Sequence, residues 1–286
     1  MNKIFVVVAA CFCALLAACS SPKIEIVSDK EISGLQGPIK EVVKVEFEAA
    51  LSDSGWVAVY PDPMLQTTCF YNEAGTLLEQ TNRASARVSD QLEYLILSWL
   101  NDQGQLVEQE GGTYGEPGYF KHFYEYDEQG RVVRQVRLDE GIQVFTTYDE
   151  KEGIVASQAQ SLEGGSCLWT RRVLYLKGGL LSSELYLDNN GNKVSELKQN
   201  FMNDGRLKIR TLGYWESGVW TEEMTEYAYD EQGRLVQEKT SYVGSDFYVI
   251  TSYSDFDDWG NWRRSEIQDH LGTPYTFSLR RFSYFD

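Results

Sequence analysis

Few residues in this sequence are arranged for catalysis. The 286 residues include two histidines, His122 and His270, which lie far apart in the chain. No serine occupies a G-x-S-x-G turn, and neither H-E-x-x-H nor a phosphate-binding P-loop is present, which removes the usual signatures of triad hydrolases, zinc peptidases and nucleotide hydrolases. We therefore predict no catalytic residue, no cofactor and no metal site, and we lean towards a protein that is not an enzyme.

Carboxylates are the one reactive group in excess, with 43 Asp and Glu against 26 Lys and Arg and a net charge of −17. A glycosidase needs only two carboxylates roughly 5–10 Å apart, and sequence alone cannot pair them across a sheet. Asp255, Asp257 and Asp258 could bind calcium, but Asp257 also fits a turn position before Gly260. The acidic charge repels phosphate backbones, so nucleic acid is not an expected partner.

Aromatic residues make up 13% of the chain, including 7 Trp and 18 Tyr. Those that recur in a repeated motif are expected to hold neighbouring strands together. Trp215 and Trp220 fall outside that motif, in an expected loop. Because tryptophan stacks on sugars and is enriched at protein interfaces, these two are candidate binding residues.

The N-terminus reads as an export signal. A lysine at position 3 precedes thirteen apolar or small residues, Ile4 to Leu16, which is too short to span a bilayer but matches a signal-peptide core. The run ends in Leu16-Ala17-Ala18-Cys19, which resembles the lipobox of bacterial lipoproteins. The resemblance implies cleavage before Cys19 and lipid on its thiol. Since Ser20 is not an aspartate linked with inner-membrane retention, we expect attachment to the bacterial outer membrane, on either face.

Two cysteines remain after Cys11 and Cys13 leave with the signal and Cys19 is lipidated. Cys69 and Cys167 occupy unlike places in their repeats. Disulfides are permitted in exported proteins, but this placement favours two separate thiols.

An internal repeat organises the rest of the chain. The hexapeptide YDEQGR occurs at 126–131 and 229–234. A relaxed pattern has a large apolar residue, a glycine four positions later and an apolar residue soon after, and its openings recur every 22 to 29 residues when the Leu187 copy is set aside. The turn glycines of these copies are Gly75, Gly104, Gly130, Gly179, Gly191, Gly205, Gly233 and Gly260.

Each copy predicts a β-hairpin. Asp or Asn opens the turn by hydrogen-bonding the backbone ahead, and glycine ends it in the left-handed conformation. The flanking residues alternate as strands do, with Tyr124 and Tyr126 on one face and Glu125 on the other. Because a lone hairpin is marginal in water, the hairpins must pair side by side. We predict an all-β fold of repeated β-hairpins forming an extended, curved antiparallel sheet.

The motif resembles the YD repeat of RHS-type proteins, over roughly residues 69–265. The ends resemble those of YD-repeat bacterial lipoproteins, in Gly34–Val42 at the start, and in Trp259–Arg264 and Arg280–Tyr284 at the close. Large RHS proteins enclose a toxin in a β shell. This chain has too few copies for such a shell, so we expect the hairpin architecture without the enclosure.

The sequence thus predicts a signal peptide at 1–18, a lipidated cysteine and tether at 19–33 and a repeat β domain at 34–286. We expect an envelope lipoprotein, attached to the membrane by its N-terminal lipid, with a binding or scaffold role towards a protein or glycan. Two alternatives stay open. One is a glycan hydrolase that uses two carboxylates, and the other is a lipoprotein that gives immunity to a toxin.

Overall fold

The computed structural model describes residues 24, 28–53, 55–85, 93–113, 118–176 and 178–286. Cys19 and the signal peptide lie outside these residues. Within these ranges, one short helix, α2, covers Asp29–Ile32 and the remaining regular structure is β. Among the described residues, no helix is long and apolar enough to cross a membrane.

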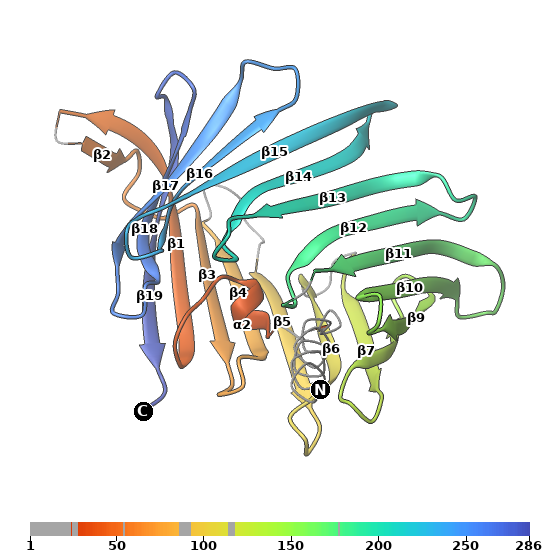
Figure 1. Ribbon diagram of the computed structural model, residues 1–286. Helices are drawn as coiled ribbons and strands as arrows, with labels where there is room; N and C mark the ends of the chain where they lie inside the picture. The colour runs from red at the N-terminus through yellow and green to blue at the C-terminus, as the bar shows by residue number, and fades with distance from the viewer. Residues whose placement is uncertain (1–23, 25–27, 54, 86–92, 114–117, 177) are drawn as a thin grey trace, which may run out of the picture.

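The strands follow one another along the chain as antiparallel neighbours (Figure 1). They are β1 (Ile39–Ser52), β2 (Gly55–Ala58), β3 (Leu65–Tyr71), β4 (Leu77–Ala84), β5 (Glu93–Leu100), β6 (Leu106–Thr113), β7 (Phe120–Tyr126), β8 (Val132–Arg137), β9 (Ile142–Asp149), β10 (Ile154–Ser161), β11 (Cys167–Tyr175), β12 (Leu181–Asp188), β13 (Lys193–Phe201), β14 (Leu207–Glu216), β15 (Val219–Tyr229), β16 (Leu235–Tyr242), β17 (Tyr248–Phe256), β18 (Trp262–Asp269) and β19 (Pro274–Tyr284).

The sheet closes on itself. β1 pairs with β3 on one side and with β19 on the other, from Ile39 opposite Tyr284 to Glu48 opposite Thr276. β1 and β3 to β19 therefore form an antiparallel barrel of eighteen strands, while β2 pairs with the far end of β1. The prediction of an all-β, antiparallel hairpin fold is confirmed, but the prediction of an open curved sheet is wrong. Closure pairs the two edge strands, which an open sheet would expose.

The hairpin architecture explains the spacing of the motif. Each copy spans two strands, so successive motif turns fall at the same end of the barrel, here called the motif end. The copy at Leu187 belongs to the turn between β12 and β13, which lies at the opposite end. This position accounts for its failure to fit the spacing of the others.

The turn of the 126–131 repeat shows the predicted geometry. The Asp127 backbone donates to the Arg131 carbonyl at 2.9 Å, and the Asp127 carboxylate accepts from the backbone of Gln129 and Arg131 at 3.0 and 2.9 Å. Gly130 has a φ of 77°, and the predicted turn glycines all have positive φ, between 77° and 88°. The left-handed glycine prediction is confirmed.

The wall of the barrel has two unlike faces. Residues that lie opposite one another on neighbouring strands share a face of the sheet, and one of the two faces holds most of the buried strand residues, so this face points inward. Its buried residues are Val42, Ile142, Val144, Val155, Ser157, Ala159, Val173, Thr225, Ser265 and Ser278. The opposite face carries cross-strand ion pairs. Lys121 contacts Glu110 at 3.3 Å, and Arg134 contacts Glu125 at 2.7 Å. The outer wall thus carries charge, and the buried positions of the inner wall hold aliphatic residues together with Ser and Thr.

Candidate functional site

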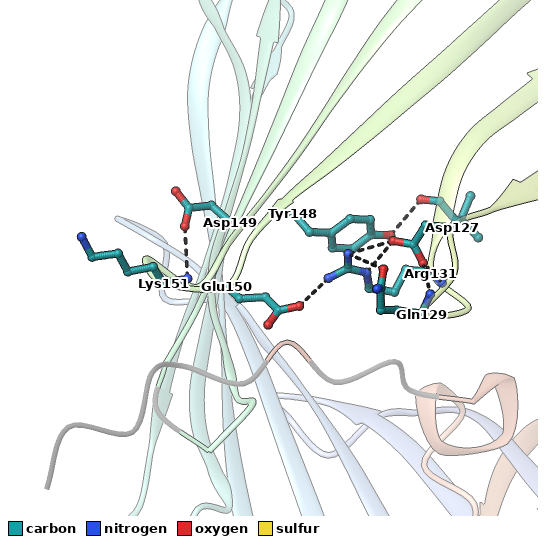
Figure 2. Close-up of polar contacts among 8 residues, drawn as sticks. Asp127, Gln129, Arg131, Tyr148, Asp149, Glu150 and Lys151 are labelled. Atoms are coloured by element: carbon teal, nitrogen blue, oxygen red, sulfur yellow. Dashed lines mark hydrogen bonds and ion pairs between the residues drawn. The ribbon is translucent and has the colours of Figure 1, made fainter. Parts of the chain in front are cut away.

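The repeated motif locks each hairpin to the next one. The Arg131 side chain binds the Asp127 carboxylate at 2.8 Å and lies 4.4 Å from the centre of the Tyr148 ring, which belongs to the following repeat (Figure 2). The Tyr148 hydroxyl donates back to the Val132 carbonyl at 2.8 Å. The Arg131 guanidinium and the Tyr148 hydroxyl therefore both have partners within the barrel.

The same contacts recur around the ring. Tyr126 and Tyr229 donate to the carbonyls of the preceding repeats, and Arg206 and Arg234 lie 4.8 and 4.5 Å from the rings of the following ones. Burial raises the pKa of Tyr126 to about 12. These aromatics, predicted as strand-holding residues, take part in packing between repeats.

The last repeat departs from this pattern. Asn261 stands where Arg131 stands in its repeat, directly after the turn glycine. Instead of covering an aromatic ring, it accepts from the Gln36 backbone at 2.7 Å, donates to the Gln36 carbonyl at 3.0 Å and reaches Tyr284 at 3.4 Å. Asp257 in the same turn also accepts from Tyr284. This group, Gln36, Asp257, Asn261 and Tyr284, is called the seam, because it joins both ends of the chain.

The seam settles how Asp257 is used. Its carboxylate accepts from the backbone of Trp259 and Asn261, each at 2.9 Å. Burial acts to raise the pKa of Asp257, but the hydrogen bonds from Tyr284 and Asn261 outweigh it and lower the pKa. The oxygens of Asp257 therefore accept hydrogen bonds in the turn and from Tyr284. This is the turn role that was weighed against calcium binding.

Beside the seam, the motif end of the barrel holds a cavity of about 710 Å³, here called the motif-end cavity. Its walls combine the last two repeat turns, the segment after α2 and inward-facing side chains of three strands. The lining residues that bear on its chemistry are Tyr229, Arg234, Glu238, Tyr253, Phe256, Trp259, Trp262 and Arg280. Ligand cavities of this size are typical of small-molecule and sugar sites.

Arg280 is the unusual group of the cavity. Its guanidinium lies 3.5 Å from the centre of the Trp262 ring, and its Nε is buried with no hydrogen-bond partner among the described residues. Burial lowers the pKa of Arg280 to about 10, although the weakly acidic Tyr253, Tyr71 and Cys69 act in the opposite direction. No carboxylate is among the groups acting on it, and no described carboxylate forms an ion pair with it.

Glu238 and Tyr253 face each other across β16 and β17 in the same cavity. Burial raises the pKa of Glu238, against the effects of a hydrogen bond from Tyr253 and of the Arg210 charge. The pKa of Tyr253 is also raised by burial and by Glu238. Within the described lining, Glu238 is the one carboxylate. A two-carboxylate glycosidase arrangement is therefore not assembled in the described part of this cavity.

The two predicted binding tryptophans lie elsewhere, on the outer wall. Trp215 and Trp220 face each other on β14 and β15 with ring centres 5.5 Å apart. They were expected in a loop, but the two strands turn tightly at Ser217-Gly218, where both residues have positive φ. Trp215 is 54% exposed and donates to the Lys193 carbonyl at 2.8 Å, while Trp220 covers Gly213.

A second cavity, of about 400 Å³, opens towards the opposite end and includes Arg137, Trp169, Tyr186 and Asp188. Near it, His122 lies 3.3 Å from Asp139, and Glu140 joins them in a cluster of the kind that can hold a metal. Burial lowers the pKa of His122. Arg137 already binds Glu140 at 3.0 Å, so these charges pair with one another.

Cys69 and Cys167 are free thiols, on β3 and β11. The Cys69 thiol donates to Gln80 at 3.7 Å, and the Cys167 thiol donates to the Trp169 carbonyl at 3.3 Å. The preference for two separate thiols agrees with this arrangement.

Sequence reasoning missed the cavity residues. Arg280 and Trp262 were noticed only as parts of the closing segment, and Glu238 carried no signal at all. Their common feature is inward orientation on the last strands, which depends on the closure of the ring.

No protein-family model matches the sequence, and no curated protein matches it. Solved structures of similar shape include a porin-like protein from Bacteroides uniformis, 13% identical with a TM-score of 0.44, over 87% of this chain and 98% of that one. A porin-like protein from Bacteroides vulgatus is 12% identical with a TM-score of 0.32, over 86% and 98%. A structure described as TcdB2-TccC3-TEV is 10% identical with a TM-score of 0.31, over 77% of this chain and 15% of that one. None of these values assigns the chain to a family.

Proposed function

We propose that this protein is an envelope lipoprotein, held to the bacterial outer membrane by lipid on Cys19, whose barrel binds a glycan in the motif-end cavity without turning it over. The observation that carries the binding role is the cavity itself, with its aromatic and polar lining. A YD-repeat origin of the barrel is part of the proposal, and the interlocking motif geometry supports it.

The charges on the outer wall favour a barrel whose outer surface faces water rather than lipid. Ion pairs occur on strands far apart in the ring, including Lys121 of β7 with Glu108 of β6 at 2.5 Å and Arg264 with Glu266, both of β18, at 2.8 Å. A cation facing the middle of a bilayer costs roughly 2–4 kcal/mol, and several such residues would make insertion of this wall strongly unfavourable. Attachment to the membrane then requires an anchor outside the barrel.

The position of the N-terminal segment fits such an anchor. The α2 backbone at Lys30 donates to the Gly75 carbonyl at 3.0 Å, and Asp29 accepts from the Leu77 backbone at 2.7 Å. Both contacts are at the motif end. Cys19 lies nine positions before Ser28, and a chain of this length reaches at most roughly 30 Å. A lipid on Cys19 would therefore keep the cavity close to the membrane surface.

The anchor is tested with a single substitution. We expect the Cys19→Ala variant to lose its membrane association, because neither the barrel wall nor any described helix replaces the lipid. Fractionation of cells and metabolic labelling with a fatty acid check this, with a Cys69→Ala variant as the control that keeps its label. Membrane retention of the unlabelled Cys19→Ala protein would contradict the proposed anchor.

The binding role is tested on the full chain, extracted in detergent. Envelope and dietary oligosaccharides are titrated while tryptophan fluorescence is followed, since Trp259 and Trp262 line the cavity. We expect saturable binding that a Trp262→Ala variant weakens and a Trp215→Ala variant does not change. Absence of binding by the folded protein to every glycan would overturn the glycan proposal, and release of new reducing ends would favour the hydrolase instead.

A further inference from the structure

Some of the cations on the inner wall are paired with carboxylates. Lys44, which lies opposite Arg280 on β1, binds Glu46 at 2.9 Å. Arg171, inward-facing on β11, binds Glu184 at 2.6 Å. Arg280 has no such partner among the described residues, and its Nε is buried without an acceptor. A desolvated cation without a counterion is costly, so a fold that keeps one at a cavity wall has left a site for an anion.

The geometry of Arg280 suits recognition of an oxyanion. The guanidinium lies 3.5 Å from the centre of the Trp262 ring, and both residues line the cavity. A guanidinium edge matches two oxygens of a carboxylate or phosphate with two parallel hydrogen bonds. Tyr253, on the neighbouring wall, offers a hydroxyl to the rest of such a ligand.

Resting on the proposed glycan-binding function, we infer that the ligand of the motif-end cavity is an acidic glycan, whose carboxylate or phosphate group is bound by Arg280 against Trp262. The aromatic rings of Tyr229 and Phe256 are already covered by Arg206 and Arg234. Recognition in this cavity therefore depends more on the charge of the ligand than on stacking of a neutral sugar ring.

The experiment compares matched sugars on the full chain. Galacturonate and galactose oligosaccharides differ only in the acidic group, and a galactose phosphate separates phosphate from carboxylate recognition. We expect one of the acidic ligands to bind at least tenfold more tightly than galactose. The Arg280→Gln variant should lose this preference, while Arg280→Lys, which keeps the charge but not the fork, should retain part of it.

Arg131→Gln serves as the matched control. Arg131 also covers an aromatic ring, but it is paired with Asp127 and does not line the cavity, so its loss should leave the acidic preference unchanged. Thermal unfolding and circular dichroism confirm that each variant is folded, and Arg280→Lys carries the test if Arg280→Gln is not.

The outcomes separate the two proposals. Equal binding of acidic and neutral sugars, unaffected by Arg280→Gln, would overturn the role of Arg280 and leave glycan binding standing. Failure of the folded protein to bind any ligand of the panel would overturn both. An acidic preference lost only in the Arg280 variants supports both.

Discussion

The middle repeats and the seam are built from the same motif, yet they use it in opposite ways. In a middle repeat, Arg131 forms an ion pair with Asp127 and lies over the Tyr148 ring. At the seam, Asn261 takes the position of that arginine and holds the opening segment through Gln36. At Arg131, Arg206 and Arg234 the residue after the turn glycine covers a ring of the next repeat, whereas at the seam a short amide supplies both a donor and an acceptor to the opening segment.

This difference also determines where a ligand can bind. In the middle repeats, the motif arginines Arg131 and Arg206 are paired with carboxylates of their own turns. Beside the seam, the repeat pattern ends, and the last strands bring Arg280, Glu238 and Trp262 to one cavity without completing their pairing. The contacts between regular repeats thus stabilise the barrel, and the proposed ligand cavity lies where the repeat pattern ends.

The largest effect is expected from breaking the seam. Asn261 is 3% exposed and bonds both backbone groups of Gln36. Asn261→Ala leaves these groups without partners, and each buried unsatisfied group costs about 1–3 kcal/mol. We expect a loss of roughly 2–4 kcal/mol in the free energy of unfolding, measured by urea denaturation.

The control for the seam is Asn192→Ala. Asn192 also follows a turn glycine and bonds its turn aspartate, Asp188, but it is exposed and holds no distant segment. Its loss should cost well under half as much. Equal losses in the two variants would show that the turn itself, and not the joining of the chain ends, accounts for the stability.

A smaller effect is expected from loosening a middle repeat. Tyr148→Phe keeps the ring under Arg131 but removes the hydroxyl that donates to the Val132 carbonyl at 2.8 Å. One such hydrogen bond contributes about 1 kcal/mol, so the denaturation midpoint should fall modestly. The exposed Tyr275 gives the control, Tyr275→Phe. A Tyr148→Phe loss as large as that of Asn261→Ala would erase the contrast between repeat and seam.

The sequence was informative where structure is local. The turn at 126–131 is specified by Asp127 and by a glycine three positions after it, so its hairpin and the left-handed Gly130 could be predicted. Closure could not, because the pairing of Val42 with Phe282 joins residues that carry no motif. The site depends on that closure. Arg280 becomes a cavity residue only when β19 lies against β1, and no spacing in the sequence reports this contact.

The smallest expected effect is on the pH dependence of stability, which should have opposite signs for a carboxylate in the cavity and a carboxylate in a repeat turn. Burial raises the pKa of Glu238 in the cavity, whereas hydrogen bonds from the Asn192 side chain and backbone lower the pKa of Asp188 in its turn. A carboxylate whose folded-state pKa is raised stabilises the fold below its unfolded pKa, and this contribution is lost as pH rises through the folded value. A carboxylate whose pKa is lowered behaves in the opposite way, and its contribution is lost as pH falls.

Thermal unfolding from about pH 2 to about pH 8 can read both signs. Relative to the parent protein, Glu238→Gln should gain in melting temperature as pH rises above the ordinary glutamate range, because it removes a charge that the cavity disfavours. Asp188→Asn should lose relative to the parent as pH rises towards the ordinary aspartate range from below, because it removes a charge that the turn favours. If both variants shifted in the same direction, the cavity carboxylate would behave as a turn carboxylate does, and the two regions would not differ electrostatically as the barrel geometry requires.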